Sequence, residues 1–225
     1  MASPPRQLAL SLDHEERLSR EDFLPGPPNE AAFGMIERWP DWPAHALAIA
    51  GPEGSGKSHL ASIWAEMSGA RVVSARALQT PMLPDALATG ALVVEDCRAD
   101  VLDERALFHL LNLVREQEAY LLMTARTPPA SWHVSLPDLA SRLRAVPVVP
   151  VSMPDDALLR AVTVKLFADR QLAVDESLIS YLQTRVGRSF AEVQAAVKAL
   201  DREALQRKRP VNRALAAELF RDSLP

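Results

Sequence analysis

An unbroken phosphate-binding pattern lies in the first third of the chain. The segment "GPEGSGKS" fits G-x-x-x-x-G-K-[ST] without a gap. Glycines at these positions let the backbone curl so that successive N–H groups face phosphate oxygens, and the positive end of a following helix adds to the attraction. In such a loop the lysine reaches the β- and γ-phosphates, and the last hydroxyl ligates Mg²⁺. The pattern predicts binding of ADP or ATP with Mg²⁺, and the residues assigned to the nucleotide here are Gly51, Gly54, Ser55, Gly56, Lys57, Ser58 and His59.

A second group of candidate residues ends an apolar run, in "ALVVED" at residues 91–96. An acid at the end of such a strand can hold the water shell of a metal ion, and its neighbour can polarise an attacking water. By position, Glu95 joins Ser58 in the metal role and Asp96 takes the water role, whereas Asp comes first in typical pairs. This exchanged order predicts slow intrinsic hydrolysis. The alternative is two solvated acids, and Cys97 beside them is expected to be a small packed residue.

The elements that would position these residues alternate along the chain. Short apolar runs predict strands at residues 45–50, 71–75, 91–95, 120–124 and 146–151. Helical spacing of apolar residues predicts helices at residues 58–67 and 104–118. Strands that alternate with helices indicate an α/β fold, with a parallel sheet covered on both faces.

The pattern becomes purely helical after Pro154. Apolar residues recur every four positions from Leu158 and again from Leu178, where Asp175 is a candidate N-cap. A capping box, "SFAE", begins a third helix, and Asn212 is a candidate cap for a last short one. We therefore expect a tail at residues 1–20, a P-loop base domain at residues 21–152 and a small C-terminal α-helical lid at residues 153–225.

Composition narrows the classes of function. The chain has 225 residues, of which 48% are hydrophobic, and its net charge of −4 argues against general affinity for DNA or anionic membranes. The basic run Arg207–Arg209 suits the carbonyl end of a helix. A single cysteine fits a reducing compartment, and no apolar run approaches the roughly 18 residues that span a bilayer. These features predict a cytoplasmic protein without membrane contacts or general affinity for DNA.

Beyond these patterns, residues 22–152 resemble the AAA+ ATPase domain of the DnaA family, and the lid does so more loosely. The segment "DFLPGPPNEAA" resembles the one that wraps the adenine in that family, with Pro27 and Asn29 at matching places. "MTARTPP" resembles the end of the sensor I strand, which implies that Thr124 meets the γ-phosphate or its water. "ALFHLLNLV" resembles the helix after the acidic strand, and we expect His109 on it to be a packing residue.

The same resemblance implies roles for two arginines. "PDLASRLRAV" resembles the segment that carries the arginine finger, and Arg142 falls on the finger position, with Arg144 as a nearby competitor. The sensor II place of the family is occupied here by Ala191, so that role passes to Arg188, one turn earlier. For each of these arginines, the alternative is an ordinary surface residue.

The leader "QLALSL" resembles the short peptide by which replication proteins dock on the β sliding clamp, DnaN. Leucines would enter an apolar pocket while the glutamine amide makes directional hydrogen bonds. A strand or helix start is the alternative interpretation. The residues assigned to clamp binding are Gln7, Leu8, Leu10 and Leu12. This leader, on a DnaA-like ATPase that we expect to lack the DNA-reading domain, resembles the Hda-type regulatory inactivators of DnaA.

That resemblance implies a clamp-tethered regulator that promotes hydrolysis of DnaA-bound ATP, with the clamp and DnaA as partners. Arg142 would act in trans, and the protein's own ATPase would be weak. One alternative is a nucleotide-gated adaptor without that effect. Another is a helicase-loader-like protein, for which we expect too few residues before Asp22. The sequence leaves the resident nucleotide open, and also the choice between monomer and homodimer.

Overall fold

The computed structural model describes residues 18–221 and divides them into two compact units. The base unit comprises residues 18–158 together with 188–190, and the helical unit comprises residues 159–187 and 191–221. The division therefore falls within the first helix after Pro154, whereas the change in sequence pattern placed it at residue 153. The P-loop, both acids and the three candidate arginines all belong to the base unit.

The base unit is built on a five-stranded parallel sheet with the order β2-β3-β4-β1-β5. Its strands are β1 (Ala46–Ala50), β2 (Arg71–Ser74), β3 (Ala91–Cys97), β4 (Tyr120–Ala125) and β5 (Val148–Pro150). The predicted α/β class with a parallel sheet is confirmed, and each strand lies where its apolar run predicted it. Because parallel neighbours need a crossover, helices separate the strands along the chain.

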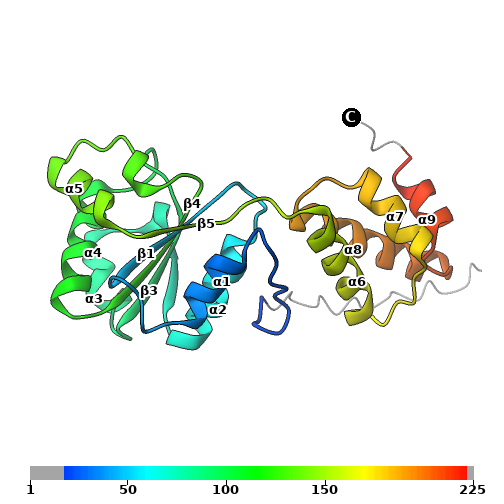
Figure 1. Cartoon of the computed structure of the whole chain (residues 1–225), viewed down its shortest axis with the longest axis horizontal. Helices are drawn as coiled ribbons and strands as arrows, with labels where there is room; N and C mark the ends of the chain where they lie inside the picture. The colour runs from blue at the N-terminus through cyan, green and yellow to red at the C-terminus, as the bar shows by residue number, and fades with distance from the viewer. Residues whose placement is uncertain (1–17, 222–225) are drawn as a thin grey trace, which may run out of the picture. The chain divides into compact units, whose positions relative to one another are not determined.

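Helices cover both faces of this sheet (Figure 1). On one face lie α1 (Glu30–Glu37) and α2 (Lys57–Ser68). On the other lie α3 (Leu83–Ala86), α4 (Glu104–Glu116) and α5 (Pro137–Ala145), with the short 3₁₀ turns η1 (Ala75–Ala77), η2 (Thr80–Met82) and η3 (Pro129–Ser131) in the connections. Successive residues of β3 enter opposite cores, which is why this strand is an apolar run without alternation.

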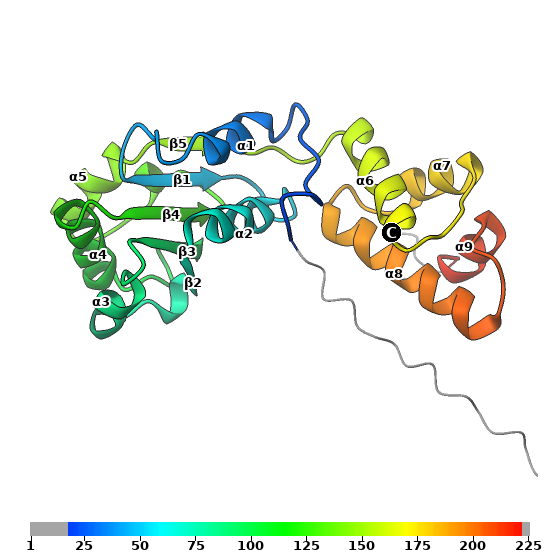
Figure 2. The same cartoon turned by 90° about the horizontal axis from the view of Figure 1, so that it is seen from below.

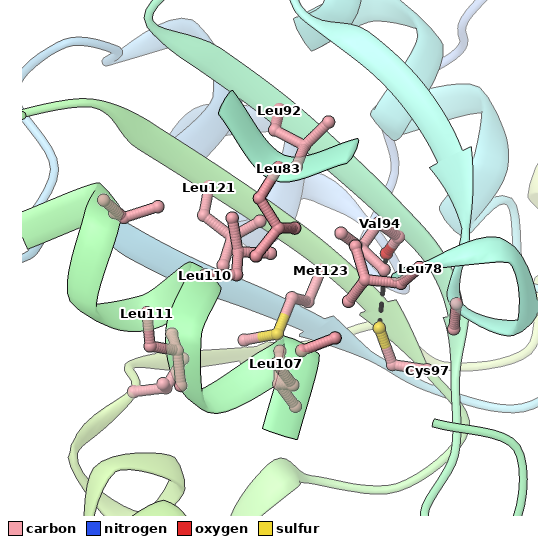
Figure 3. Packing of buried hydrophobic residues seen from close by; sticks show 14 of the residues in the cluster. Leu78, Leu83, Leu92, Val94, Cys97, Leu107, Leu110, Leu111, Leu121 and Met123 are labelled. Atoms are coloured by element: carbon pink, nitrogen blue, oxygen red, sulfur yellow. Dashed lines mark hydrogen bonds between the residues drawn. The ribbon is translucent and has the colours of Figure 1, made fainter. Parts of the chain in front are cut away.

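Leucine is the commonest residue in the core on the α4 side, followed by alanine. Figure 3 shows Leu83 and the α4 leucines meeting Leu92, Leu121 and Met123 of the sheet. Cys97 is buried in the same cluster, its Sγ donates to the carbonyl oxygen of Val94 at 3.4 Å, and burial raises the pKa of its thiol. The expectation of a small packed cysteine is therefore confirmed.

One expectation about α4 is wrong. His109 is exposed, whereas it was expected to pack. The buried stripe of α4 runs through Leu107, Leu110, Leu111 and Val114. At 100° per residue, His109 lies about 200° around the helix from Leu107, so its side chain leaves on the solvent face.

The helical unit contains α7 (Glu176–Arg185), α9 (Arg213–Leu219) and most of α6 (Asp156–Asp169) and α8 (Phe190–Arg207) (Figure 2). Both predicted N-caps are confirmed: the Asp175 carboxylate accepts from Leu178 N–H at 2.9 Å, and Asn212 Oδ1 accepts from Leu215 N–H at 3.0 Å. As expected, the basic run follows the end of a helix, where Arg207 and Arg209 both pair with Glu218. Among residues 18–221, no helix is long and apolar enough to cross a membrane.

Candidate functional site

Strand order brings three separate sequence segments to one edge of the sheet. Since all the strands are parallel, their carboxyl ends share that edge, and β4 lies between β1 and β3. The P-loop follows β1, the two acids are the penultimate residues of β3, and Thr124 lies near the end of β4, opposite Ile49 of β1. The predicted phosphate, metal and sensor I residues are therefore neighbours in space.

The P-loop backbone requires glycine at three positions for two different reasons. A Cβ atom on Gly51 would lie 2.1 Å from the carbonyl oxygen of Val151, so the loop begins where two backbones nearly touch. Gly54 and Gly56 have φ angles of 78° and 91°, in the left-handed region that favours glycine. Gly51 N–H also donates to the carbonyl oxygen of Ala125 at 3.1 Å, which fixes the start of the loop to β4.

The side chains of the P-loop differ sharply in exposure. Lys57 is buried, and its Nζ donates to the carbonyl oxygen of Pro52 at 2.7 Å. Burial lowers the pKa of the Lys57 ammonium, and the charge of Asp96 partly opposes that effect. Ser55 is 1% exposed, and its Oγ has no hydrogen-bond partner among the described residues. Ser58, in the first turn of α2, is exposed.

The two acids at the end of β3 lie in different environments. Glu95 is half-buried, and its Oε1 is buried without a partner in the part of the chain that the structure describes. Asp96 is exposed and has a φ angle of 54°, at a register shift between Val94 and Cys97. A short acid tolerates this left-handed backbone better than most residues. The backbone thus changes direction between the two residues, so that the Glu95 carboxylate is partly buried and the Asp96 carboxylate faces solvent.

Thr124 holds that turn. Its side chain is 1% exposed, and its Oγ1 accepts from Asp96 N–H at 3.0 Å. The predicted contact of Thr124 with the γ-phosphate or its water stays a prediction, but its contact with the acidic strand was missed. No sequence signal identifies that bond, because it joins a backbone group and a side chain on neighbouring strands.

The predicted adenine-binding loop is braced from within. Asn29 is 2% exposed; its Oδ1 accepts from Gly26 N–H at 2.8 Å, and its Nδ2 donates to the carbonyl oxygen of Leu24 at 3.2 Å. Pro27 is exposed on the loop. The Asn29 amide therefore fixes the loop conformation, and contact of Pro27 or Asn29 with a base stays a prediction.

His59 ties the N-terminal part of the base unit to the P-loop helix. Its Nε2 lies 2.8 Å from the carbonyl oxygen of Ser19, and its ring meets the ring of Phe23 edge to face at 5.1 Å. Next to these residues, Arg20 pairs with Glu37 at 2.6 Å. These contacts give His59 a structural role, and its contact with nucleotide stays a prediction. The predicted clamp-binding residues, Gln7–Leu12, lie outside the described residues.

The candidate arginines have unlike surroundings. Arg142, in the last turn of α5, is half-buried, and its Cζ lies 5.3 Å from the centre of the Phe108 ring. Arg144 is exposed. The Arg188 guanidinium lies 3.5 Å from the Asp156 carboxylate, and its side chain is 76% exposed. Within residues 18–221, Arg142 and Arg144 make no ion pair, so their charges are not neutralised by a nearby acid.

Two features of the site region had no sequence signal. Arg126, just after β4, pairs with Glu53 of the P-loop at 2.5 Å, and its positive charge helps to lower the pKa of Lys57, behind burial. The Glu104 carboxylate accepts from the N–H groups of Ser135 and Leu136, immediately before α5. Both contacts join residues far apart in the chain, where spacing carries no information.

No protein-family model matches the sequence. Among solved structures, the chain is similar to domain III of the replication initiation protein DnaA from Thermotoga maritima, with a TM-score of 0.75 and 18% identity, covering 92% of this chain and 97% of that one. It is also similar to AMPPCP-bound DnaA from Aquifex aeolicus, with a TM-score of 0.67 and 18% identity, covering 83% of this chain and 65% of that one.

A protein with a different task has a related fold. The RuvB Holliday junction branch migration motor of Thermotoga maritima matches with a TM-score of 0.63 and 16% identity, covering 79% of this chain and 61% of that one. These likenesses establish a DnaA-like AAA+ fold for the chain. Since the same fold serves an initiator and a motor, function has to be argued from the residues of the site.

Proposed function

We propose that the base unit binds ADP or ATP with Mg²⁺ at the P-loop. The observation that carries this proposal is the pair of buried oxygen atoms, Ser55 Oγ and Glu95 Oε1, that lack a partner among residues 18–221. Buried polar atoms are almost always satisfied, so two unsatisfied oxygens at the carboxyl edge of the sheet call for a ligand. The desolvated Lys57 supports the same conclusion, because a nearby anion would restore the charged form that burial disfavours.

The residues present fit this ligand. The P-loop N–H groups and Lys57 would hold the phosphates, while Ser58 and Glu95 would hold Mg²⁺, directly or through its water. Bound Mg²⁺ would offset the negative charge of the phosphates. The exposed Asp96 carboxylate would orient or deprotonate an attacking water, and the hydroxyl of Thr124 fixes the backbone that carries it. The unusual order of the acids supports slow turnover.

We further propose that the protein is an Hda-type regulator that promotes hydrolysis of ATP bound to DnaA. Arg142 would be supplied in trans to the partner's nucleotide and would offset charge on the transferred phosphoryl group. Two features support this role: the resemblance of its segment to the finger segment of DnaA-like ATPases, and a guanidinium without an acidic partner in the described chain. Arginine fingers accelerate hydrolysis by roughly 10³- to 10⁵-fold.

Gln7, Leu8, Leu10 and Leu12 would tether the protein to the β sliding clamp. Within the described residues, Ser19 contacts His59 of α2 and Arg20 pairs with Glu37 of α1. The seven peptide links from Leu12 to Ser19 span at most about 25 Å. A leader bound to the clamp would therefore keep the base unit close to the DNA that the clamp encircles, where DnaA also works.

The test is phosphate release from DnaA–ATP in the presence of DNA-loaded clamp, with and without this protein. Arg142→Ala should keep binding of clamp and nucleotide but abolish the stimulation. Arg144→Ala, two residues away on the same helix and also unpaired, is the matched control and should stay active. The double variant Leu10→Ala, Leu12→Ala should lose the part of the stimulation that requires the clamp. It should keep any stimulation that is measured without the clamp.

Nucleotide binding is tested separately, by extracting nucleotide from the purified protein and identifying it by chromatography. The wild type should carry ADP or ATP, and Lys57→Met should carry neither. Full stimulation by Arg142→Ala would remove the finger role. Clamp and nucleotide binding without any effect on DnaA–ATP would favour the nucleotide-gated adaptor instead.

A further inference from the structure

Two side chains of α4, one helical turn apart, contact opposite ends of α5. Glu104 contacts the beginning of α5, and Phe108 contacts Arg142 in its last turn. Positions four apart on a helix lie on the same side, so one row of α4 meets both ends of its neighbour. The two helices lie side by side on the same face of the sheet (Figure 1).

The beginning of α5 depends on Glu104 because its own sequence provides no cap. Leu136 is the N-cap and contributes no side-chain hydrogen bond, and Pro137 follows it. The Glu104 carboxylate instead accepts from Ser135 N–H at 2.8 Å and from Leu136 N–H at 3.0 Å. A carboxylate at this place satisfies donors that would otherwise need water, and its charge is favourable at the positive end of the helix.

The end of α5 carries Arg142 over an aromatic ring. Phe108 is half-buried and packs against the core, so its ring has a fixed place in the base unit. The Arg142 guanidinium lies over that ring, and its helix is anchored in the core by the buried residues Leu139 and Leu143. A cation–π contact uses the positive charge of the guanidinium and no hydrogen-bond acceptor. Within residues 18–221 no hydrogen bond occupies the N–H donors of Arg142, so they remain available for an anion.

We propose that Glu104 and Phe108 are positioning residues for Arg142, which hold its guanidinium ready for the triphosphate of a partner ATPase. This inference rests on the proposed function of Arg142. A long arginine side chain without a fixed partner would have to be ordered before each hydrolysis step, and that ordering lowers the rate of catalysis. Glu104 fixes the helix that carries Arg142, and Phe108 fixes the side chain itself.

The experiment compares Phe108→Leu with Phe108→Trp in the DnaA–ATP hydrolysis assay with clamp and DNA. Leucine keeps an apolar side chain but removes the ring, whereas tryptophan keeps a ring. We expect Phe108→Leu to lower the maximal stimulated rate about two- to fivefold, the factor that an exposed cation–π contact is worth. Phe108→Trp should restore most of that rate, and the concentration of protein that gives half the stimulation should change little.

Glu104 is tested with a matched control on the same helix. Glu104→Gln keeps the shape but loses the charge that holds the N–H groups of Ser135 and Leu136. Glu116→Gln removes an exposed carboxylate from the last turn of α4. This carboxylate makes no hydrogen bond within residues 18–221. We expect the first variant to lower the maximal stimulated rate and the second to leave it unchanged. Equal rates for the two would overturn the role of Glu104.

A second readout uses the free protein and does not depend on DnaA. In spectra of protein with ¹⁵N-labelled arginine, the Nε–Hε resonance of Arg142 should be displaced by the ring of Phe108. Phe108→Leu should move it toward the position of Arg144, and Phe108→Trp should keep it displaced. An unmoved resonance in Phe108→Leu would overturn the contact and the proposal with it.

The two readouts also separate this proposal from the proposed function. A resonance that moves in Phe108→Leu while the stimulated rate stays at the wild-type level would overturn the positioning role. The finger role would survive that result as long as Arg142→Ala abolished stimulation. Full stimulation by Arg142→Ala would instead overturn the finger role, and the positioning role would fall with it whatever the resonance did.

Discussion

The backbone of Gly51 lies so close to the carbonyl oxygen of Val151 that a side chain at Gly51 should destabilise the fold. This expectation can be tested without nucleotide or partner. In Gly51→Ala the new Cβ would start 2.1 Å from Val151 O, whereas real contacts of this kind hardly ever fall below 3.0 Å. The strand end or the loop must therefore yield by about 0.9 Å, the difference between those two values. The two atoms nearest to the new Cβ are the carbonyl oxygen and carbonyl carbon of Val151. Because both belong to the backbone, no side-chain rotation can relieve the clash.

The expected cost follows from what that shift disturbs. Overpacking in a well-packed region costs about 1–3 kcal/mol. Val151 N–H donates to Ala50 O at 2.8 Å, and a weakened bond there adds about 0.5–1.5 kcal/mol. We therefore expect Gly51→Ala to lower the free energy of unfolding by roughly 2–4 kcal/mol, measured in urea without nucleotide.

Gly34→Ala is the control, and its effect should have the opposite sign. Gly34 lies inside α1, and a Cβ there would meet nothing within 4 Å. Alanine should raise the free energy of unfolding by about 0.5–1 kcal/mol, because glycine loses more backbone entropy in a helix. If Gly51→Ala were as stable as the wild type while Gly34→Ala behaved as expected, the backbone approach at the start of the P-loop would be refuted.

Two further predictions concern single hydrogen-bond acceptors. Thr124→Val keeps the shape of a buried side chain but leaves Asp96 N–H without its acceptor, so the free energy of unfolding should fall by about 1–3 kcal/mol. Thr124→Ser keeps the hydroxyl and should stay close to the wild type. Equal urea midpoints for the two variants would contradict this. Hydrogen bonds from Ser177 and Leu178 lower the pKa of Asp175 in the folded protein. The stability that Asp175 contributes is therefore fully present above its unfolded pKa of about 3.9. It is lost as the pH falls through the lower folded pKa. Asp175→Asn removes this titration, and the free energy of unfolding, followed by helical circular dichroism between about pH 5 and pH 2, should fall less steeply than in the wild type; parallel curves would contradict the assignment.

Much of the fold was predictable because its signals are local. The turn at Gly54 and Gly56 requires φ angles that glycine tolerates, and the short caps Asp175 and Asn212 satisfy N–H groups only three residues away. Each strand appeared as an apolar run because both faces of a parallel sheet are buried. Residue type and spacing within a few positions determine such features.

The sequence proposes the members of the candidate site, but it carries no information on how they are connected. Lys57 was predicted from the P-loop pattern, Glu95 and Asp96 from the end of an apolar run, and Thr124 from a family resemblance. Their grouping requires β4 to lie between β1 and β3. Spacing could not reveal the bond from Asp96 N–H to Thr124, because the register of two strands from distant segments decides it. His109 was misjudged although helical spacing alone places it about 200° around α4 from Leu107, away from the buried stripe.

The sequence by itself determined the phosphate loop, the alternation of strands and helices and the helix caps, since each depends on neighbours along the chain. Only the tertiary structure decided which side chains join segments that are far apart in the chain. Glu104 supports a helix that begins more than thirty residues later, and Phe108 lies under an arginine of that same helix. Contacts of this kind depend on how helices pack on a sheet, and packing is settled by the shape and volume of the whole core.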